Sequence, residues 1–292
     1  MLRLLGLWRT FQTVLLYLTL AVGLGGLLCQ APVLWNLGLR LRKGPLNMYL
    51  LHLAVADTLF LACQLGFSMA QAALGSASDP LHLVVSCLWF AAGLWLLAAF
   101  ATERCVSDIV PSCCARCRPR HTSAALCALL WALALLAVLL PANACGLLGR
   151  RARPLACLRL HAAGIAWLAS AACVACGAGL ALFIWVACCS GRPRPQFYGI
   201  VLASTLLLLP CGLPYLLYWS LRPVLDLLLP PFRPLASLLA CVCSSSRPLM
   251  YFVVGRRPGK REPLAVVLRR ALEEAAPALG GAGGLGLPLG RM

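Results

Sequence analysis

Long apolar runs separated by short polar or basic stretches make up most of this chain. A helix needs about 20 apolar residues to cross a hydrocarbon layer roughly 30 Å thick. Lipid offers the backbone no hydrogen-bond partners, so a helix, which pairs its own N–H and C=O groups, is the expected spanning structure. The pattern predicts an all-α membrane protein, a seven-transmembrane helix bundle within residues 1–262. We place its spans at 11–39, 46–73, 81–106, 122–145, 157–189, 197–221 and 230–254.

A second kind of pattern follows the seventh run. Residues 263–276 place Leu264, Val267 and Leu268 on one face and charged residues elsewhere. This spacing predicts a short amphipathic cytoplasmic helix lying on the inner membrane surface, with a solvated tail helix as the alternative. Residues 277–292 are mostly Gly, Leu, Ala and Pro, and we expect a disordered cytoplasmic tail there.

Composition supports the membrane interpretation. Of the 292 residues, 62% are hydrophobic and 11% are charged, far below the roughly 25% charged residues of soluble domains. The net charge of +17, from 25 Lys and Arg against 8 Asp and Glu, would suggest nucleic acid in a soluble protein. Here the basic residues flank apolar runs, so they are typical of anchors at the lipid bilayer. We therefore expect no nucleic-acid partner.

The distribution of basic residues predicts the orientation. With an extracellular amino terminus, 16 Lys and Arg lie in cytoplasmic segments and 8 in outer ones, while Arg247 falls inside the seventh run. Cytoplasmic loops carry the excess of Lys and Arg in membrane proteins. We expect a multi-pass protein of the plasma membrane with an extracellular amino terminus and a cytoplasmic carboxy terminus.

Two ionisable side chains lie well inside the apolar runs. Asp57 is in the middle of the second run and Arg247 is in the inner half of the seventh. A charge at the centre of a membrane helix costs roughly 2.5–3.5 kcal/mol on insertion scales, so each needs a partner or a role. These two residues are the first candidates for function.

The third run ends in Glu103-Arg104-Cys105. The neighbouring carboxylate can hold the guanidinium, whose planar set of donors suits the backbone carbonyls of a partner protein. A simple membrane anchor is the alternative. In the sixth run, Gly212 and Pro214 stand close together, and proline removes a helix hydrogen bond. This predicts either a hinge or a static kink.

The order and spacing of these motifs resemble the rhodopsin-like G-protein-coupled receptors, and within them the Mas-related receptor family. The resemblance extends over nearly the whole chain. It is carried by LAVAD in the second run, ERC ending the third, Trp131 in the fourth, LPCGLP in the sixth and RPLMY in the seventh.

The resemblance implies roles for several residues. The Arg matching Arg104 meets the G protein when the sixth helix swings outward, and the Tyr matching Tyr251 helps to hold that open state. Gly212 stands where rhodopsin-like receptors usually carry Trp. The Mas-related family commonly lacks Trp at this position. Pro214 remains, so the hinge prediction is kept without a large aromatic side chain beside it.

The seventh run departs from the usual pattern, because Arg247 replaces Asn. Related receptors bind sodium beside the second-helix Asp with help from polar side chains, but the matching positions here are Gly93 and Cys243. We hypothesise that Arg247 pairs with Asp57 and takes the place of sodium. The alternative is that Arg247 extends to the inner interface. In the first run, Gln30 retains an amide that can reach Asp57, and Pro32 is expected to disturb packing.

The resemblance also implies a disulfide between Cys145, at the end of the fourth run, and Cys157, at the start of the fifth. Two free outer thiols are the alternative. On the inner side, Cys113, Cys114, Cys117 and His121 are close in sequence. Their compressed spacing favours free or palmitoylated thiols over a zinc site, and we expect no metal or cofactor.

For the ligand, the resemblance argues against a simple amine, because Ser86 stands where aminergic receptors have the Asp that serves as its counter-ion. Pro141 and His161 stand where some Mas-related receptors carry the acids that bind cationic peptides. With few outer acids among several arginines, we expect a neutral or anionic ligand. The candidate pocket residues are Ser86, Trp89, His161, Tyr215 and Trp219.

The sequence thus predicts a receptor, not an enzyme, that transmits an extracellular peptide or small-molecule ligand to a heterotrimeric G protein. By resemblance, the G protein is of the phospholipase-activating class and the cells are nociceptive sensory neurons. The alternative is a receptor-like protein without ligand control, constitutive or a dimer partner. A transporter or channel predicts inverted repeats and a polar path, and an enzyme predicts clustered His, Asp or Glu within the bilayer; we find neither pattern.

Overall fold

The computed structural model describes residues 2–40, 45–74, 80–109, 122–148, 153–188, 198–229, 232–256 and 266–267. These residues fold almost entirely into helices. The elements are α1 (Leu2–Trp35), η1 (Asn36–Arg40), α2 (Pro45–Leu74), α3 (Pro80–Ile109), α5 (Thr122–Ala144), α6 (Pro154–Cys188), α7 (Tyr198–Leu207), η2 (Leu208–Gly212), α8 (Leu213–Leu228) and α9 (Phe232–Gly255), of which η1 and η2 are single π-helical turns.

Seven spans in this described part of the chain are long and apolar enough to cross a membrane. The first covers Thr10–Leu39 and joins α1 to η1, and the sixth covers Tyr198–Arg222 and joins α7, η2 and α8. These spans confirm the predicted seven-helix membrane bundle. The first helix extends further than predicted, because α1 already begins at Leu2.

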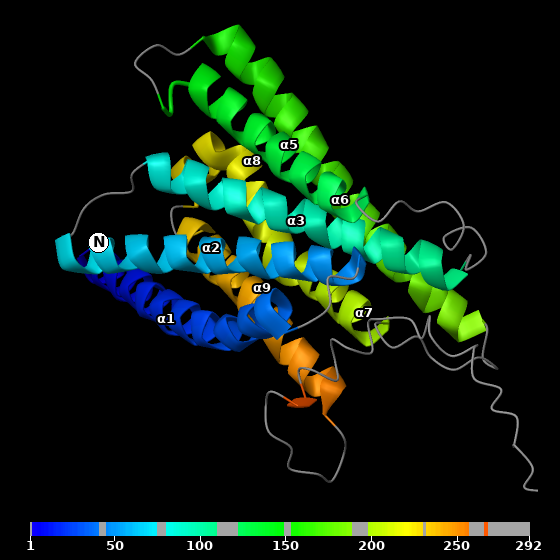
Figure 1. The fold of residues 1–292 in the computed structure, drawn as a ribbon. Helices are drawn as coiled ribbons and strands as arrows, with labels where there is room; N and C mark the ends of the chain where they lie inside the picture. The colour runs from blue at the N-terminus through cyan, green and yellow to red at the C-terminus, as the bar shows by residue number, and fades with distance from the viewer. Residues whose placement is uncertain are drawn as a thin grey trace, which may run out of the picture.

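The third helix is the centre of the bundle. In its most apolar stretch 78% of residues are buried, against 28% for the first and fourth spans. Figure 1 shows α3 between α2 on one side and α5 with α6 on the other, while α1, α2 and α9 lie together. Ala91, Ala92 and Ala98 on α3 are fully buried, and small residues of this kind let membrane helices approach closely. Residues on α3 therefore have neighbours on several other helices.

The contact between α1 and α9 is especially close. A Cβ added to Gly26 would lie 2.1 Å from Ser245 Oγ and 2.9 Å from Ser245 Cβ. Ser245 Oγ donates a hydrogen bond to the carbonyl of Val22, 3.2 Å away. Only a glycine leaves room for this approach, which brings the first and the seventh span together in one wall of the bundle.

The sixth span is irregular where the sequence predicted a hinge or a kink. In the π-helical turn η2, the N–H of Leu213 donates to the carbonyl of Leu208, five residues earlier. Pro214 follows at once and has no N–H for the carbonyl of Pro210. The helix bends again at Leu221, whose φ of −114° and ψ of 20° are non-helical.

The first span also contains a proline. Pro32 lies inside α1, and η1 begins four residues later. The side-chain amide of Asn36 donates to the carbonyl of Pro32, 2.7 Å away. The π-helical turn therefore begins about one helical turn after Pro32, the residue at which the sequence predicted disturbed packing.

Several predictions fall largely or wholly outside the described residues. Of the predicted amphipathic helix at 263–276, only Val266 and Val267 are described, both helical. The predicted tail at 277–292 and the cysteines at 113, 114 and 117 with His121 lie outside the described part of the chain. These remain expectations from the sequence.

Candidate functional site

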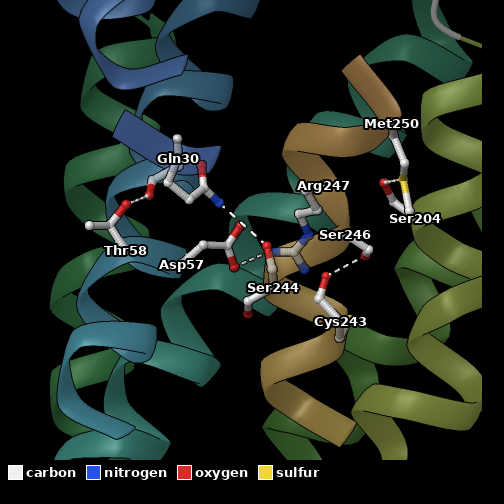
Figure 2. Close-up of polar contacts among 10 residues, drawn as sticks. Gln30, Asp57, Thr58, Ser204, Cys243, Ser244, Ser246, Arg247 and Met250 are labelled. Carbon is white, nitrogen blue, oxygen red and sulfur yellow. Dashed lines mark hydrogen bonds and ion pairs between the residues drawn. The ribbon is translucent and has the colours of Figure 1, made fainter. Parts of the chain in front are cut away.

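An ion pair lies in the middle of the bundle. Asp57 on α2 and Arg247 on α9 are 3% and 6% exposed. Arg247 Nη1 donates a hydrogen bond to Asp57 Oδ1. Figure 2 shows the guanidinium directed across the helix interface at the carboxylate. Two residues 190 positions apart in sequence, each costly alone in an apolar environment, thus neutralise each other.

The surroundings of the pair are small and only partly polar. A Cβ on Gly93 would lie 3.9 Å from both Arg247 Nη1 and Asp57 Oδ1, so α3 packs directly against the charges. Gln30 does not bond Asp57 directly; its Nε2 donates to the carbonyl of Ser244, 3.4 Å away. Cys243, one residue earlier on α9, is buried. The guanidinium therefore fills the space beside Asp57 next to Gly93 and Cys243, and Ser244 of α9 adds a polar side chain near the carboxylate.

Arg104 lies at one end of the bundle, which we call the Arg104 end. Glu103 and Arg104 are half-buried in the last two turns of α3, which runs to Ile109. Tyr251 of α9 is buried in an apolar cluster that includes Phe100 of α3, and Cys105 packs against the same cluster. The structure thus brings Tyr251 and the end of α3 into one neighbourhood.

Gly212 in η2 has little free space beside it. An added Cβ would lie 2.5 Å from Leu208 Cδ1 and 3.5 Å from Phe90 Cζ. Phe90 of α3 contacts Tyr215 of α8 with a ring-centroid distance of 5.0 Å, and Phe60 of α2 contacts both rings at 5.7–5.8 Å. Leu208 and the ring of Phe90, which packs with Phe60 and Tyr215, therefore occupy the space that a large side chain at position 212 would need.

The opposite end of the bundle carries a disulfide, and we call it the disulfide end. Cys145 and Cys157 are bonded, with Cα atoms 4.7 Å apart, which confirms the predicted bridge. The N–H of Arg153 donates to the carbonyl of Ala144, 2.9 Å away, so the backbone also joins the end of α5 to the start of α6. The bridge fixes the spacing of these two helices.

A cavity of about 420 Å³ opens at the disulfide end. Residues of α3, α5, α6 and α8 line it together with the disulfide. They are Leu83, Pro141, Ala142, Cys145, Leu147, Cys157, His161, Trp219, Arg222 and Asp226. This volume is within the range of about 300–1,000 Å³ that is usual for small-molecule sites.

The cavity contains two of the five candidate ligand residues. His161 and Trp219 line it, with ring centroids 5.8 Å apart, and His161 Nε2 lies 3.4 Å from the carbonyl of Ser220. Ser86 and Tyr215 are buried in the packed interior, and Trp89 packs edge-on against Trp131. These three do not line the cavity.

Two charged residues of the cavity were not among the candidates. Arg222 and Asp226 are one helical turn apart on α8, with Arg222 Nε 3.4 Å from Asp226 Oδ2. The signal in the sequence was an Arg and an Asp at i and i+4 just beyond an apolar run. Such a pair is common on exposed helices, so the pattern alone does not mark a pocket.

Comparisons with known proteins agree with this arrangement. The chain is 62% identical over 287 residues to the Mas-related G-protein coupled receptor member G of Homo sapiens, covering 98% of each protein. The chain belongs to the Mas-related G-protein-coupled receptors. It is also 50% identical to member G of Rattus norvegicus over the full length of both chains, and 37% identical to member E of Homo sapiens over 91% of this chain and 87% of that one. No protein-family model matches the sequence.

Membership decides several predictions. The Mas-related receptors are receptors rather than enzymes, and a chain of this family with seven apolar spans is a multi-pass protein of the plasma membrane. The predicted resemblance to the Mas-related family is confirmed, and the human, rat and mouse relatives that are 62%, 50% and 51% identical are all member G receptors. The Arg104 end, the ion pair and the cavity therefore belong to a G-protein-coupled receptor.

Proposed function

We propose that this receptor binds an extracellular peptide or small molecule in the cavity at the disulfide end and activates a heterotrimeric G protein at the Arg104 end. In this proposal the amino terminus is extracellular and the carboxy terminus cytoplasmic, as the excess of Lys and Arg indicates. The cavity has the size and the mixed apolar and polar lining of a small-molecule site.

One observation supports the proposed switch most strongly. The sixth span carries the cavity residue Trp219 on α8 and, about two turns away, the π-helical turn that ends at Gly212. A ligand that moves α8 therefore acts on the same continuous helix that is weakened at η2 and Pro214. Helices bend most readily at such breaks. Motion about this hinge would carry α7 away from the end of α3 and expose Arg104.

Arg104 is the proposed contact for the G protein, held by the neighbouring carboxylate of Glu103. A guanidinium presents several donors in one plane, which suits carbonyls at the end of a partner helix. Tyr251, packed beside Phe100 at the same end, is the residue proposed to hold the open state. The coupling we propose is to the phospholipase-activating class of G protein, in nociceptive sensory neurons.

The ion pair between Asp57 and Arg247 is proposed to act as the receptor's built-in cation. In this proposal the guanidinium of Arg247, which is tethered to α9 and contacts Asp57, takes the place that sodium has in related receptors. Such a pair links α2 to α9 permanently, whereas a bound ion can leave. A receptor built this way would respond to the ligand without a contribution from extracellular sodium.

A receptor-like protein without ligand control is the second candidate. The observation in its favour is Gly212, which replaces the large aromatic side chain of a ligand-driven toggle while Phe90 fills the adjacent space. Such a protein would signal at a constant level or act as a dimer partner.

A cell-based panel of G-protein activation tests both candidates. The chain and its Arg104→Ala variant are expressed at equal surface levels and measured first without ligand and then with peptide and lipid libraries. The proposal predicts a signal that depends on Arg104 and rises with at least one library member. A constant signal that depends on Arg104 would favour the second candidate. Equal signals from both constructs under every condition would exclude the receptor mechanism.

A further inference from the structure

The two charged residues of the cavity, Asp226 and Arg222, differ in how many of their polar atoms are hydrogen-bonded. Both carboxylate oxygens of Asp226 are engaged, since Tyr218 donates its hydroxyl to Oδ1 at 3.0 Å and Arg222 donates Nε to Oδ2 at 3.4 Å. Arg222 uses only that one nitrogen: its two Nη groups make no hydrogen bond with any residue that the structure describes. Arg222 therefore offers the cavity charged donors that no described residue engages.

The rest of this end of the bundle adds positive charge. Arg153, Arg159 and Arg233 lie near the ends of α6 and α9 on the same side, while Asp226 is the single acidic residue that the described ranges place there. The side chain of Arg222 is 28% exposed, so its charge is only partly screened by solvent. An excess of one sign around a partly closed cavity attracts ligands of the opposite sign.

The remaining wall of the cavity is apolar. Leu83, Pro141 and Leu147 line it with Trp219, which offers a flat aromatic face. Pro141 carries no charge, and the ring of His161 already has a carbonyl 3.4 Å from Nε2. A ligand cation would find no unengaged carboxylate in this cavity. An apolar body would find a surface of matching chemistry.

We propose that the cavity binds an anionic amphiphile, with a carboxylate on the Nη groups of Arg222 and an apolar, aromatic-sized body against Leu83, Pro141 and Trp219. Guanidinium and carboxylate form paired, charge-assisted hydrogen bonds, which are stronger than neutral ones. The consequence of binding, signalling, rests on the proposed function above. The binding itself does not, so the two can be tested apart.

The test uses the full-length receptor in lipid nanodiscs and three probes with one apolar body. These are biphenyl-4-acetate, the alcohol 2-(biphenyl-4-yl)ethanol and the amine 2-(biphenyl-4-yl)ethylamine. Affinity is measured by equilibrium dialysis, with empty nanodiscs as the correction for partition into lipid. We expect the carboxylate to bind about tenfold more tightly than the alcohol, as one added charge-assisted hydrogen bond provides, and the amine to bind most weakly.

The preference must depend on Arg222. Arg222→Gln is expected to reduce it to about twofold or less, whereas Arg256→Gln, a matched change at an exposed arginine just beyond α9 at the Arg104 end, should leave it unchanged. Asp226→Asn keeps the shape of the cavity and removes its negative charge, so it should strengthen carboxylate binding. That variant also decides the matter if Arg222→Gln fails to fold.

Equal binding of carboxylate and alcohol, or a preference unchanged in Arg222→Gln, would overturn this assignment. So would an Asp226→Asn variant that binds the carboxylate more weakly than the parent chain. Carboxylate binding that needs Arg222 but activates no G protein would support the site and count against the proposed function. Arg104-dependent signalling with no preference for the carboxylate would do the reverse.

Discussion

The Asp57–Arg247 pair places two opposite charges side by side in an apolar interior. Moving two charges into an apolar interior costs several kcal/mol for each ion, and their attraction offsets this only while both are present. The observed pair uses a single N–H···O contact rather than a two-pronged one. Its net contribution to stability is therefore small, but removing either partner leaves an unpaired charge.

The small contribution of the intact pair, set against the large cost of removing one partner, predicts the behaviour of three variants. Asp57→Asn and Arg247→Met should each destabilise the bundle, Arg247→Met by about 3–5 kcal/mol, because breaking a buried pair leaves a lone charge. The double variant Asp57→Asn/Arg247→Met should recover most of the loss. Thermal unfolding of the purified receptor measures this. Additive losses in the double variant would mean that the two residues do not act as a pair.

The same pair predicts indifference to sodium. Because the guanidinium already fills the space beside Asp57, replacing choline chloride with sodium chloride at constant ionic strength should leave the thermal unfolding midpoint unchanged. The Asp57→Asn variant should be equally indifferent. A midpoint that rises with sodium in the parent chain, and not in Asp57→Asn, would show a sodium site and contradict the proposed role of Arg247.

At the scale of single residues, the sequence predicted those functional candidates that are marked by their charge. Asp57 and Arg247 were identified because they are ionisable groups deep inside apolar runs, and such groups must find partners. The cavity was harder to predict. Ser86 and Tyr215 are buried in the packed interior, and burial depends on how neighbouring helices are rotated. A π-helical turn adds a residue and turns the rest of the helix by about 100°, so the face of α8 cannot be derived from a regular helical period.

At the scale of helices, close approach depends on small residues at particular positions. Gly26 allows α1 to contact α9 at Ser245, while its neighbour Gly25 has no atom within 4 Å of an added Cβ. Of these two adjacent glycines, Gly26 thus faces the packed side chains of a neighbouring helix and Gly25 faces open space. The existence and length of both helices follow from the apolar pattern, but their contact depends on this detail of packing.

The two glycines give a matched pair of variants. Gly26→Ala should destabilise the receptor by about 1–3 kcal/mol, because Ser245 Cβ is fixed to the backbone and the helices must separate. Gly25→Ala should have little effect, and Gly26→Ala/Ser245→Gly should recover much of the loss. The measurement is the thermal unfolding midpoint in one detergent. Equal effects at positions 25 and 26 would contradict the observed contact.

At the scale of the whole molecule, the bundle separates the two ends to which we assign ligand binding and G-protein coupling in our proposal. The cavity, the disulfide and Arg222 lie at one end, and Arg104 and Tyr251 lie at the other. The sequence predicted this architecture because seven apolar runs in lipid leave few other solutions. It also assigned the disulfide end to the outside, from the balance of Lys and Arg in alternate segments.

That orientation has a direct test. An epitope at the amino terminus should bind antibody on intact cells, and an epitope at the carboxy terminus should bind only after the cells are permeabilised. The reason is that the segments with the excess of Lys and Arg stay in the cytoplasm. The opposite staining pattern would place the cavity inside the cell and Arg104 outside, where no G protein could reach it.

The most direct test of the account is guanine-nucleotide exchange by purified heterotrimeric G proteins in the presence of the receptor in nanodiscs. We predict that the receptor accelerates exchange by at least one heterotrimer, with the phospholipase-activating class first, and that Arg104→Ala reduces this acceleration about tenfold or more, a loss of roughly 1.4 kcal/mol of interaction. No acceleration of any heterotrimer by a folded receptor, or equal acceleration by the Arg104→Ala variant, would contradict the proposal that this bundle couples to G proteins through the end of α3.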